Sequence, residues 1–134
     1  GSHVAKRLLA GEEIILCNVE KIIITGDPIK TTHEYLRRLR IRTKTNPMKG
    51  PFHPRTPEGI VRKTIRGMLP RRRRTGKDAF KRLTVYVGIP PELANEHMEV
   101  YAPALGKNLR RRYIHLGTLA RRLGKDNKYW RVQQ

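Results

Sequence analysis

The stretch IILCNVEKIIITGDP, residues 14–28, contains two short apolar runs followed by a helix start signal. The runs at residues 14–17 and 22–24 are apolar throughout and include the cysteine at position 17. Such uninterrupted runs are typical of strands that are covered on both faces. Asp27 followed by Pro28 provides a capping side chain and then a proline for the first turn of a helix. Strands that alternate with helices predict an α/β fold.

The flanking segments continue this alternation. Residues 4–10 are expected to form the end of a helix, which Gly11 closes because glycine readily adopts the left-handed conformation after a helix. The helix that begins after Asp27 is expected to bury one face, and Arg37, Arg38 and Arg42 lie largely off that face. The predicted face consists of Ile29, Thr32, Tyr35, Leu36 and Leu39.

A proline-rich loop precedes the next predicted helix. Residues 43–56 contain three prolines and one glycine, which favours an irregular but stiffened loop. Thr56 and Pro57 repeat the cap-then-proline signal, and Pro70 ends the helix that follows. One face of that helix is expected to be in the core, and the opposite face, with Arg62, Lys63 and Arg66, is expected to contact a polyanion. The predicted core face consists of Ile60, Val61, Thr64, Ile65 and Met68.

The remainder of the chain is less strongly patterned. Thr75 and Asp78 have the spacing of a capping box, which predicts a short helix through Arg82 and then a strand at 83–87. Residues 98–105 are expected to be extended or irregular, and residues 116–123 to form a helix closed by Gly124. Residues 125–134 form a polar tail. At 134 residues the chain is expected to be a single domain, residues 1–134.

Positive charge is concentrated in one segment. Residues 35–82 hold 17 of the 30 Lys and Arg residues and two acidic residues, Glu58 and Asp78, which leaves +15 of the net +19 in this segment. We call it the basic region. Such a density indicates a polyanionic partner, and the 6% aromatic content favours phosphate binding to folded RNA over stacking of a succession of unpaired bases. The lone Cys17 and the lack of long apolar runs predict an intracellular protein without disulfides or a membrane anchor.

Enzymatic and metal chemistry has little support in this sequence. Gly76 and Lys77 resemble the end of a phosphate-binding loop, but Arg71 stands where that loop needs glycine and Asp78 where it needs Ser or Thr. His97 between two glutamates is interpreted as a surface group rather than as a metal ligand. We therefore predict no catalytic residues, no metal, no cofactor and no small-molecule substrate.

Several motifs resemble one known family. NPMKGPFHPRTPEGIVRKTIRGMLP (46–70) and RTGKDAFKRLTVYVGIP (74–90) closely resemble the large-subunit ribosomal protein thirteen family. VAKRLLAGEEIILCNVEKIIITGD (4–27) is similar to its early helix and second strand, and YIHLGTLARRLG (113–124) to its C-terminal helix. The N-P-x-K-G-P loop resembles the archaeal and eukaryotic branch.

This resemblance implies a three-layer α/β/α domain with a small, largely parallel sheet of about four strands. Members of the family begin with a further strand, and none precedes Val4 here; Gly1, Ser2 and His3 are compatible with a native segment or an expression scar. The implied function is structural: binding large-subunit ribosomal RNA beside neighbouring ribosomal proteins in cytoplasmic ribosomes, with nucleolar assembly in a eukaryote. The alternative is a regulatory RNA-binding protein that controls translation off the ribosome.

The predicted RNA-binding residues come from the basic region. The resemblance assigns Arg62, Lys63, Arg66 and Gly67, the last because glycine permits close backbone approach. The other predicted contacts are Arg37, Arg38, Arg42, Lys44, Lys49, Arg55, Arg71, Arg72, Arg73, Arg74, Lys77, Lys81 and Arg82.

Overall fold

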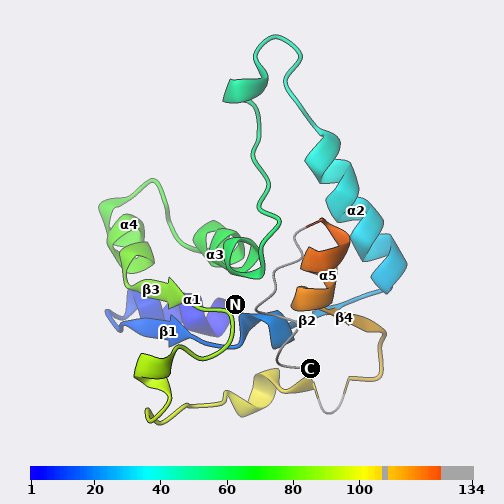
Figure 1. The fold of residues 1–134 in the computed structure, drawn as a ribbon. Coiled ribbons are helices and arrows are strands. Elements are labelled where there is room, and N and C mark those ends of the chain that lie inside the picture. Colours follow the sequence, from blue (N-terminus) through cyan, green and yellow to red (C-terminus); the bar gives the residue numbers. More distant parts are fainter. Residues whose placement is uncertain (107–108, 125–134) are drawn as a thin grey trace.

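The computed structural model describes residues 1–106 and 109–124 of the chain (Figure 1). The helices are α1 (Ser2–Leu9), α2 (Pro28–Arg40), α3 (Pro57–Met68), α4 (Arg74–Lys81) and α5 (Leu116–Arg122). The strands are β1 (Ile14–Leu16), β2 (Ile23–Thr25), β3 (Leu83–Val85) and β4 (Tyr113–His115). Single 3-10 turns are η1 (Val19–Lys21), η2 (Pro47–Lys49), η3 (Pro91–Leu93) and η4 (Ala102–Ala104). The predicted α/β class is confirmed, and the predicted polar tail, 125–134, lies outside the described residues.

The strands form two separate pairs. β1 runs parallel to β3, with Ile14 opposite Leu83, and β2 runs antiparallel to β4, with Ile24 opposite Ile114. Within the described residues this differs from the expected single, largely parallel sheet. The cause lies between β1 and β2, where Asn18 has a left-handed backbone (φ 54°) and η1 follows directly. This turn redirects the second apolar run away from β1 and toward β4, a strand that was not predicted.

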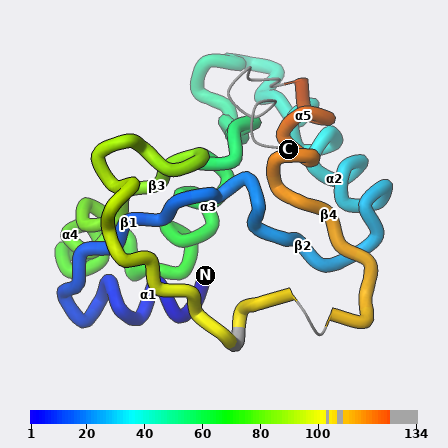
Figure 2. Tube along the Cα trace, turned by 60° about the horizontal axis from the view of Figure 1, so that its bottom comes forward, coloured from blue at the N-terminus to red at the C-terminus, as the bar shows by residue number. Residues whose placement is uncertain are grey.

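The two strand pairs lie in different halves of the molecule (Figure 2). β1 and β3 lie with α1, α3 and α4, and β2 and β4 lie with α2 and α5. α3 joins the halves because it contacts α1, β3, η1 and α5. The largest fully buried apolar side chains come from both halves, namely Leu8, Val19, Ile65, Leu116 and Leu119. α3 is therefore anchored in the core along one face.

Five predicted core positions are wrong, because the structure leaves Ile15, Ile22, Ile29, Thr64 and Met68 exposed. Ile15 is 50% exposed because the helices gather on the β1–β3 face that carries the buried Leu83 and Val85. Ile29 is 66% exposed in the first turn of α2, and Met68 is 48% exposed in the last turn of α3. Ile29 and Met68 each lie in a terminal turn of their helix, where the apolar face extends past the element that packs against it. Sequence periodicity does not show where that neighbour ends.

The helix starts at Asp27 and Thr56 are confirmed. The Asp27 carboxylate accepts a hydrogen bond from the Ile29 amide at 2.8 Å, and the Thr56 hydroxyl accepts one from the Gly59 amide at 3.3 Å. The backbone amides at the start of α2 lower the pKa of Asp27 because they stabilise its charged form. Gly11 and Gly124 have φ of +105° and +83°, as expected for glycines that end helices.

The predicted capping box at Thr75 is wrong. α4 begins at Arg74, two residues before the start at Gly76 that a Thr75 cap implies, and the extended backbone of Arg73 occupies the capping position without a side-chain hydrogen bond. Asp78 instead lies 3.7 Å from the Arg74 guanidinium. The strand predicted at 83–87 ends at Val85.

The irregular segment after β3 is attached to α1. Arg7 forms an ion pair with Glu99 at 3.1 Å, and the rings of His3 and Tyr101 stack with centroids 4.0 Å apart. The Glu99 carboxylate therefore stabilises this attachment. Residues 1–106 and 109–124 contain no group of three potential metal ligands. No helix in these ranges is long and apolar enough to cross a membrane.

Candidate nucleic-acid interface

The basic region occupies one side of the molecule. Its elements are α2, the segment at residues 41–56, which we call the arm, then α3 and α4. In Figure 1 they form the upper side, and the arm projects furthest from the strands. The predicted RNA-binding residues are exposed with one exception, Arg82.

Five cations line one hollow between α3 and α4. This hollow has a volume of about 770 Å³, and no acidic residue among those that the structure describes lines it. We call it the arginine hollow. Its lining consists of Arg66, Leu69, Arg71, Arg72, Gly76, Lys77, Phe80 and Lys81. Leu69 and Phe80 provide apolar atoms to the lining, and a concave site with low-dielectric walls focuses the field of its cations more than a flat surface does.

A close backbone approach at Gly76 shapes this hollow. A Cβ at Gly76 would lie 2.3 Å from the carbonyl oxygen of Pro70 and 2.5 Å from its carbonyl carbon. Leu69 is buried beneath the same turn, and the Arg73 amide donates a hydrogen bond to Pro70 at 3.0 Å. The absence of a side chain at Gly76 thus lets α4 pack against the turn that carries the arginines.

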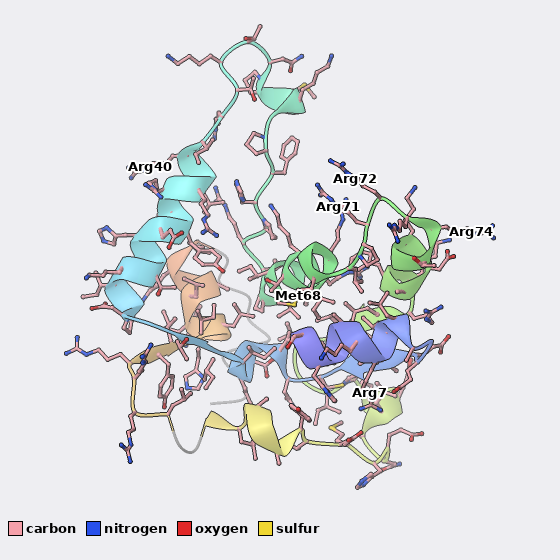
Figure 3. All side chains as sticks on the ribbon, turned by 180° about the vertical axis from the view of Figure 1, so that it is seen from behind. Arg7, Arg40, Met68, Arg71, Arg72 and Arg74 are labelled. Carbon is pink, nitrogen blue, oxygen red and sulfur yellow. The ribbon has the colours of Figure 1, made fainter. Side chains whose placement is uncertain are left out.

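The four consecutive arginines do not act as one unit. Arg71 and Arg72 extend from the turn into the space beside α3, whereas Arg74 points outward on the far side of α4 (Figure 3). Arg74 is also the residue that lies near Asp78. A run of four adjacent residues cannot all face one way across a turn and a helix start, so the structure divides the tetrad.

Other predicted residues have contacts within the protein. Arg38 forms an ion pair with Glu34, and the Arg62 guanidinium lies 5.3 Å from the centroid of the Phe80 ring. Lys63 donates a hydrogen bond to the carbonyl oxygen of Phe52 at 2.9 Å. These cations remain exposed, but contacts within the protein set their positions before any ligand arrives.

Arg82 is integrated into the fold. Its Nη2 donates a hydrogen bond to the carbonyl oxygen of Leu8 at 2.8 Å, and its Nε is buried without a partner among the described residues. The guanidinium therefore joins the end of α1 to the start of β3. The structure thus gives Arg82 a role in packing, which its position in a basic segment did not reveal.

Sequence reasoning missed Arg40. Arg40, at the end of α2, lines a hollow of about 350 Å³ together with Arg42 and Arg55 of the arm. Its position between the predicted Arg38 and Arg42 was the available signal. The structure brings Arg42 and Arg55 together although 12 residues separate them in the chain.

His53 lies between two cations from different helices. Its ring Nδ1 is 3.2 Å from the Lys63 ammonium of α3, and Arg38 of α2 lines the same pocket. Partial burial lowers the pKa of His53 below its usual 6.5, and the positive charges of Lys63 and Arg38 lower it further. The lowered pKa favours the neutral imidazole, whose unprotonated Nδ1 accepts a hydrogen bond from the Lys63 ammonium.

The free energy of unfolding is expected to fall as the pH drops below about 6.5. Below that value the unfolded chain binds a proton at His53 more readily than the folded chain does. The loss of stability ends once the pH is below the pKa of His53 in the folded protein. Urea unfolding at pH 7.5 and 5.5 measures the difference in the free energy of unfolding. His53→Asn should reduce the difference, whereas the matched change at the exposed His97, His97→Asn, should preserve it. Equal pH dependence in all three proteins would contradict this assignment.

The chain is similar to a defined set of known proteins. A family model described as ribosomal protein L13 matches residues 2–92. The protein of Archaeoglobus fulgidus named large ribosomal subunit protein uL13 is 40% identical over 125 residues, covering 92% of this chain and 78% of its own length. The uL13 proteins of Methanopyrus kandleri and Methanosarcina barkeri are each 44% identical, cover 92% of this chain, and are matched over 77% and 87% of their lengths.

The matched residues include most of the surface described above. The family model extends from α1 through β3 and therefore covers the arm, α3, the arginine turn and α4. The relatives named here are archaeal, in agreement with the branch predicted from the N-P-x-K-G-P loop. On this match and these identities, the chain belongs to the ribosomal protein L13 family.

Proposed function

We propose that this chain is a structural constituent of the large ribosomal subunit that binds and neutralises folded ribosomal RNA and supports subunit assembly. The arginine hollow is the observation that carries the proposal, because five cations converge there and no acid lines it. Such a cluster repels itself, and phosphate groups relieve that repulsion. No catalytic step and no cofactor are part of the proposal.

The arrangement of the cations suits a folded RNA backbone. Arg66 on α3, Arg71 and Arg72 on the turn, and the lysines of α4 approach the hollow from three directions. Arginine donates two parallel hydrogen bonds to a phosphate, and lysine supplies a point charge. Each phosphate of a single strand, or of two strands on either side of a groove, could therefore bind one of these cations.

Gly67 supports a close approach by the RNA. It lies beside Arg66 in the last turn of α3, and a Cβ at this position would meet no protein atom within 4 Å. The protein itself therefore does not require glycine here. An external backbone that packs against the helix would explain a residue that otherwise weakens a helix.

The names of the relatives support the choice of RNA. They are large ribosomal subunit proteins, so we assign ribosomal RNA and neighbouring ribosomal proteins as the partners and the ribosome as the location. Their archaeal origin gives no support to assembly in a nucleolus. The RNA-contacting residues in the proposal are those predicted from the sequence, with Arg40 added and Arg82 removed.

Sedimentation tests the proposal against its alternative. In a sucrose gradient of cell lysate, the chain is expected to appear in large subunits at one copy per subunit and to remain there after a wash at high salt. A surface protein bound only by a few exposed charges would dissociate in that wash. A chain found only in the free pool at the top of the gradient would contradict the proposal and favour a regulatory role off the ribosome.

A further inference from the structure

The arm carries an apolar groove that is separate from the arginine hollow. This arm groove has a volume of about 400 Å³, near the lower end of the range for ligand pockets. Ile41, Met48 and Phe52 provide apolar walls, and Arg42 and Arg55 flank them. Within residues 1–106 and 109–124, no acidic residue lines the groove. The groove therefore combines an aromatic ring with two cations.

The apolar side chains of the arm are exposed in the free protein. Met48 is 85% exposed and Phe52 is 74% exposed. Large apolar side chains that gather at one exposed place mark a binding surface, because burying them in the protein itself would have been favourable. Ile41, also on the arm, is more than half exposed. Burial of these side chains requires a partner.

The backbone holds the arm in place. The Asn46 side chain accepts a hydrogen bond from the Met48 amide at 3.1 Å, and the Gly50 amide donates to Pro47 at 3.2 Å. The return segment is attached to α3 by the hydrogen bond from Lys63 to the carbonyl oxygen of Phe52. Three prolines restrict the backbone further. These contacts reduce the conformational freedom that would be lost when a ligand binds.

We propose that the arm groove binds one unpaired nucleotide of the RNA, with its base against Phe52 and Met48 and its phosphates on Arg42 and Arg55. This inference rests on the proposed function and adds a second kind of contact to it. Every base presents a π-face to an aromatic ring, and the flanking arginines match the charge of a nucleotide rather than that of an apolar peptide. The low aromatic content of the chain agrees with a site for a single base.

The test compares two RNA hairpins that differ by one nucleotide. One has a single unpaired 2-aminopurine in its stem, and the other has a continuous stem. The wild-type protein is expected to bind the first more tightly and to quench the fluorescence of its 2-aminopurine. Phe52→Ala should weaken binding to that hairpin about 5- to 150-fold, because stacking on one base is lost, and should change binding to the continuous stem less than about twofold.

Two control variants separate stacking from folding and from charge. Phe52→Tyr retains an aromatic ring and should preserve both the preference and the quenching. Arg72→Ala, in the arginine hollow, should weaken both hairpins by a similar factor and leave the preference intact. Because Phe52 is exposed, the unfolding temperature of Phe52→Ala should match that of the wild-type protein.

The two proposals fail in different ways. Equal affinity of the wild-type protein for the two hairpins, or an unchanged preference in Phe52→Ala, would overturn the nucleotide site and leave RNA binding in place; the arm would then be a contact for a neighbouring protein. Failure of the wild-type protein to bind either hairpin or large-subunit ribosomal RNA would overturn the proposed function itself.

Discussion

Replacing Arg66, Arg71 and Arg72 together by alanine is expected to lower the affinity for large-subunit ribosomal RNA about 10²- to 10³-fold at 0.1 M salt. These three side chains line the arginine hollow, where no acid offsets them. Each phosphate contact contributes a slope of about 0.9 to the dependence of log K on log salt. The slope should therefore fall by about 2 to 3 units, which filter binding to Methanosarcina barkeri large-subunit RNA across a salt series measures.

A second triple variant separates this site from the effect of net charge. Lys30, Arg110 and Arg111 are exposed cations outside the basic region, and their replacement by alanine removes the same total charge. This control should lower the slope by less than about one unit, because screening weakens charges that do not touch the RNA. If the two triple variants had equal slopes of log K against log salt, the arginine hollow would not be part of the RNA interface.

Gly76→Ala is expected to destabilise the protein by about 3 kcal/mol, a decrease in unfolding temperature of roughly 10 °C. The new Cβ would lie 2.3 Å from the Pro70 carbonyl oxygen, and that atom belongs to the backbone of the arginine turn. Either α4 or the turn must move, and movement of the turn displaces Arg71 and Arg72. Thermal unfolding monitored by circular dichroism measures the loss, and RNA affinity should fall with it.

Gly67→Ala is the matched control for Gly76→Ala. Both are the same substitution within a helix, but a Cβ at Gly67 meets no protein atom within 4 Å. Alanine should therefore stabilise α3 by up to about 1 kcal/mol. A loss of stability in both variants would show that steric contact with Pro70 is not the cause. A gain of stability in Gly67→Ala together with weaker RNA binding would support close approach of the RNA at this turn.

Local signals in the sequence were sufficient to locate most helices. The caps at Asp27 and Thr56 depend on amide groups two or three residues away, so the sequence contains all of the interaction. The same holds for the stop at Pro70 and for the glycines that follow α1 and α5. The capping box at Thr75 failed because the extended backbone of Arg73 starts α4 first.

Strand pairing could not be predicted in the same way. The partner of β1 follows after three intervening helices, and the partner of β2 is the short β4 near the end of the described residues. A run of three residues is too short to indicate a strand by itself. The choice between one sheet and two pairs depends on the turn at Asn18 and on contacts across the whole chain.

Composition and motifs by themselves predicted a polyanion-binding surface within the basic region and a resemblance to the ribosomal protein L13 family. Charge and short motifs depend only on residues that are close in the sequence, so they can be recognised without knowledge of the fold. Only the tertiary structure decided which cations lie together: five line the arginine hollow, Arg74 points away, and Arg82 joins α1 to β3. The physical reason is that the direction of a side chain depends on the backbone turn that carries it and on the element packed beneath it.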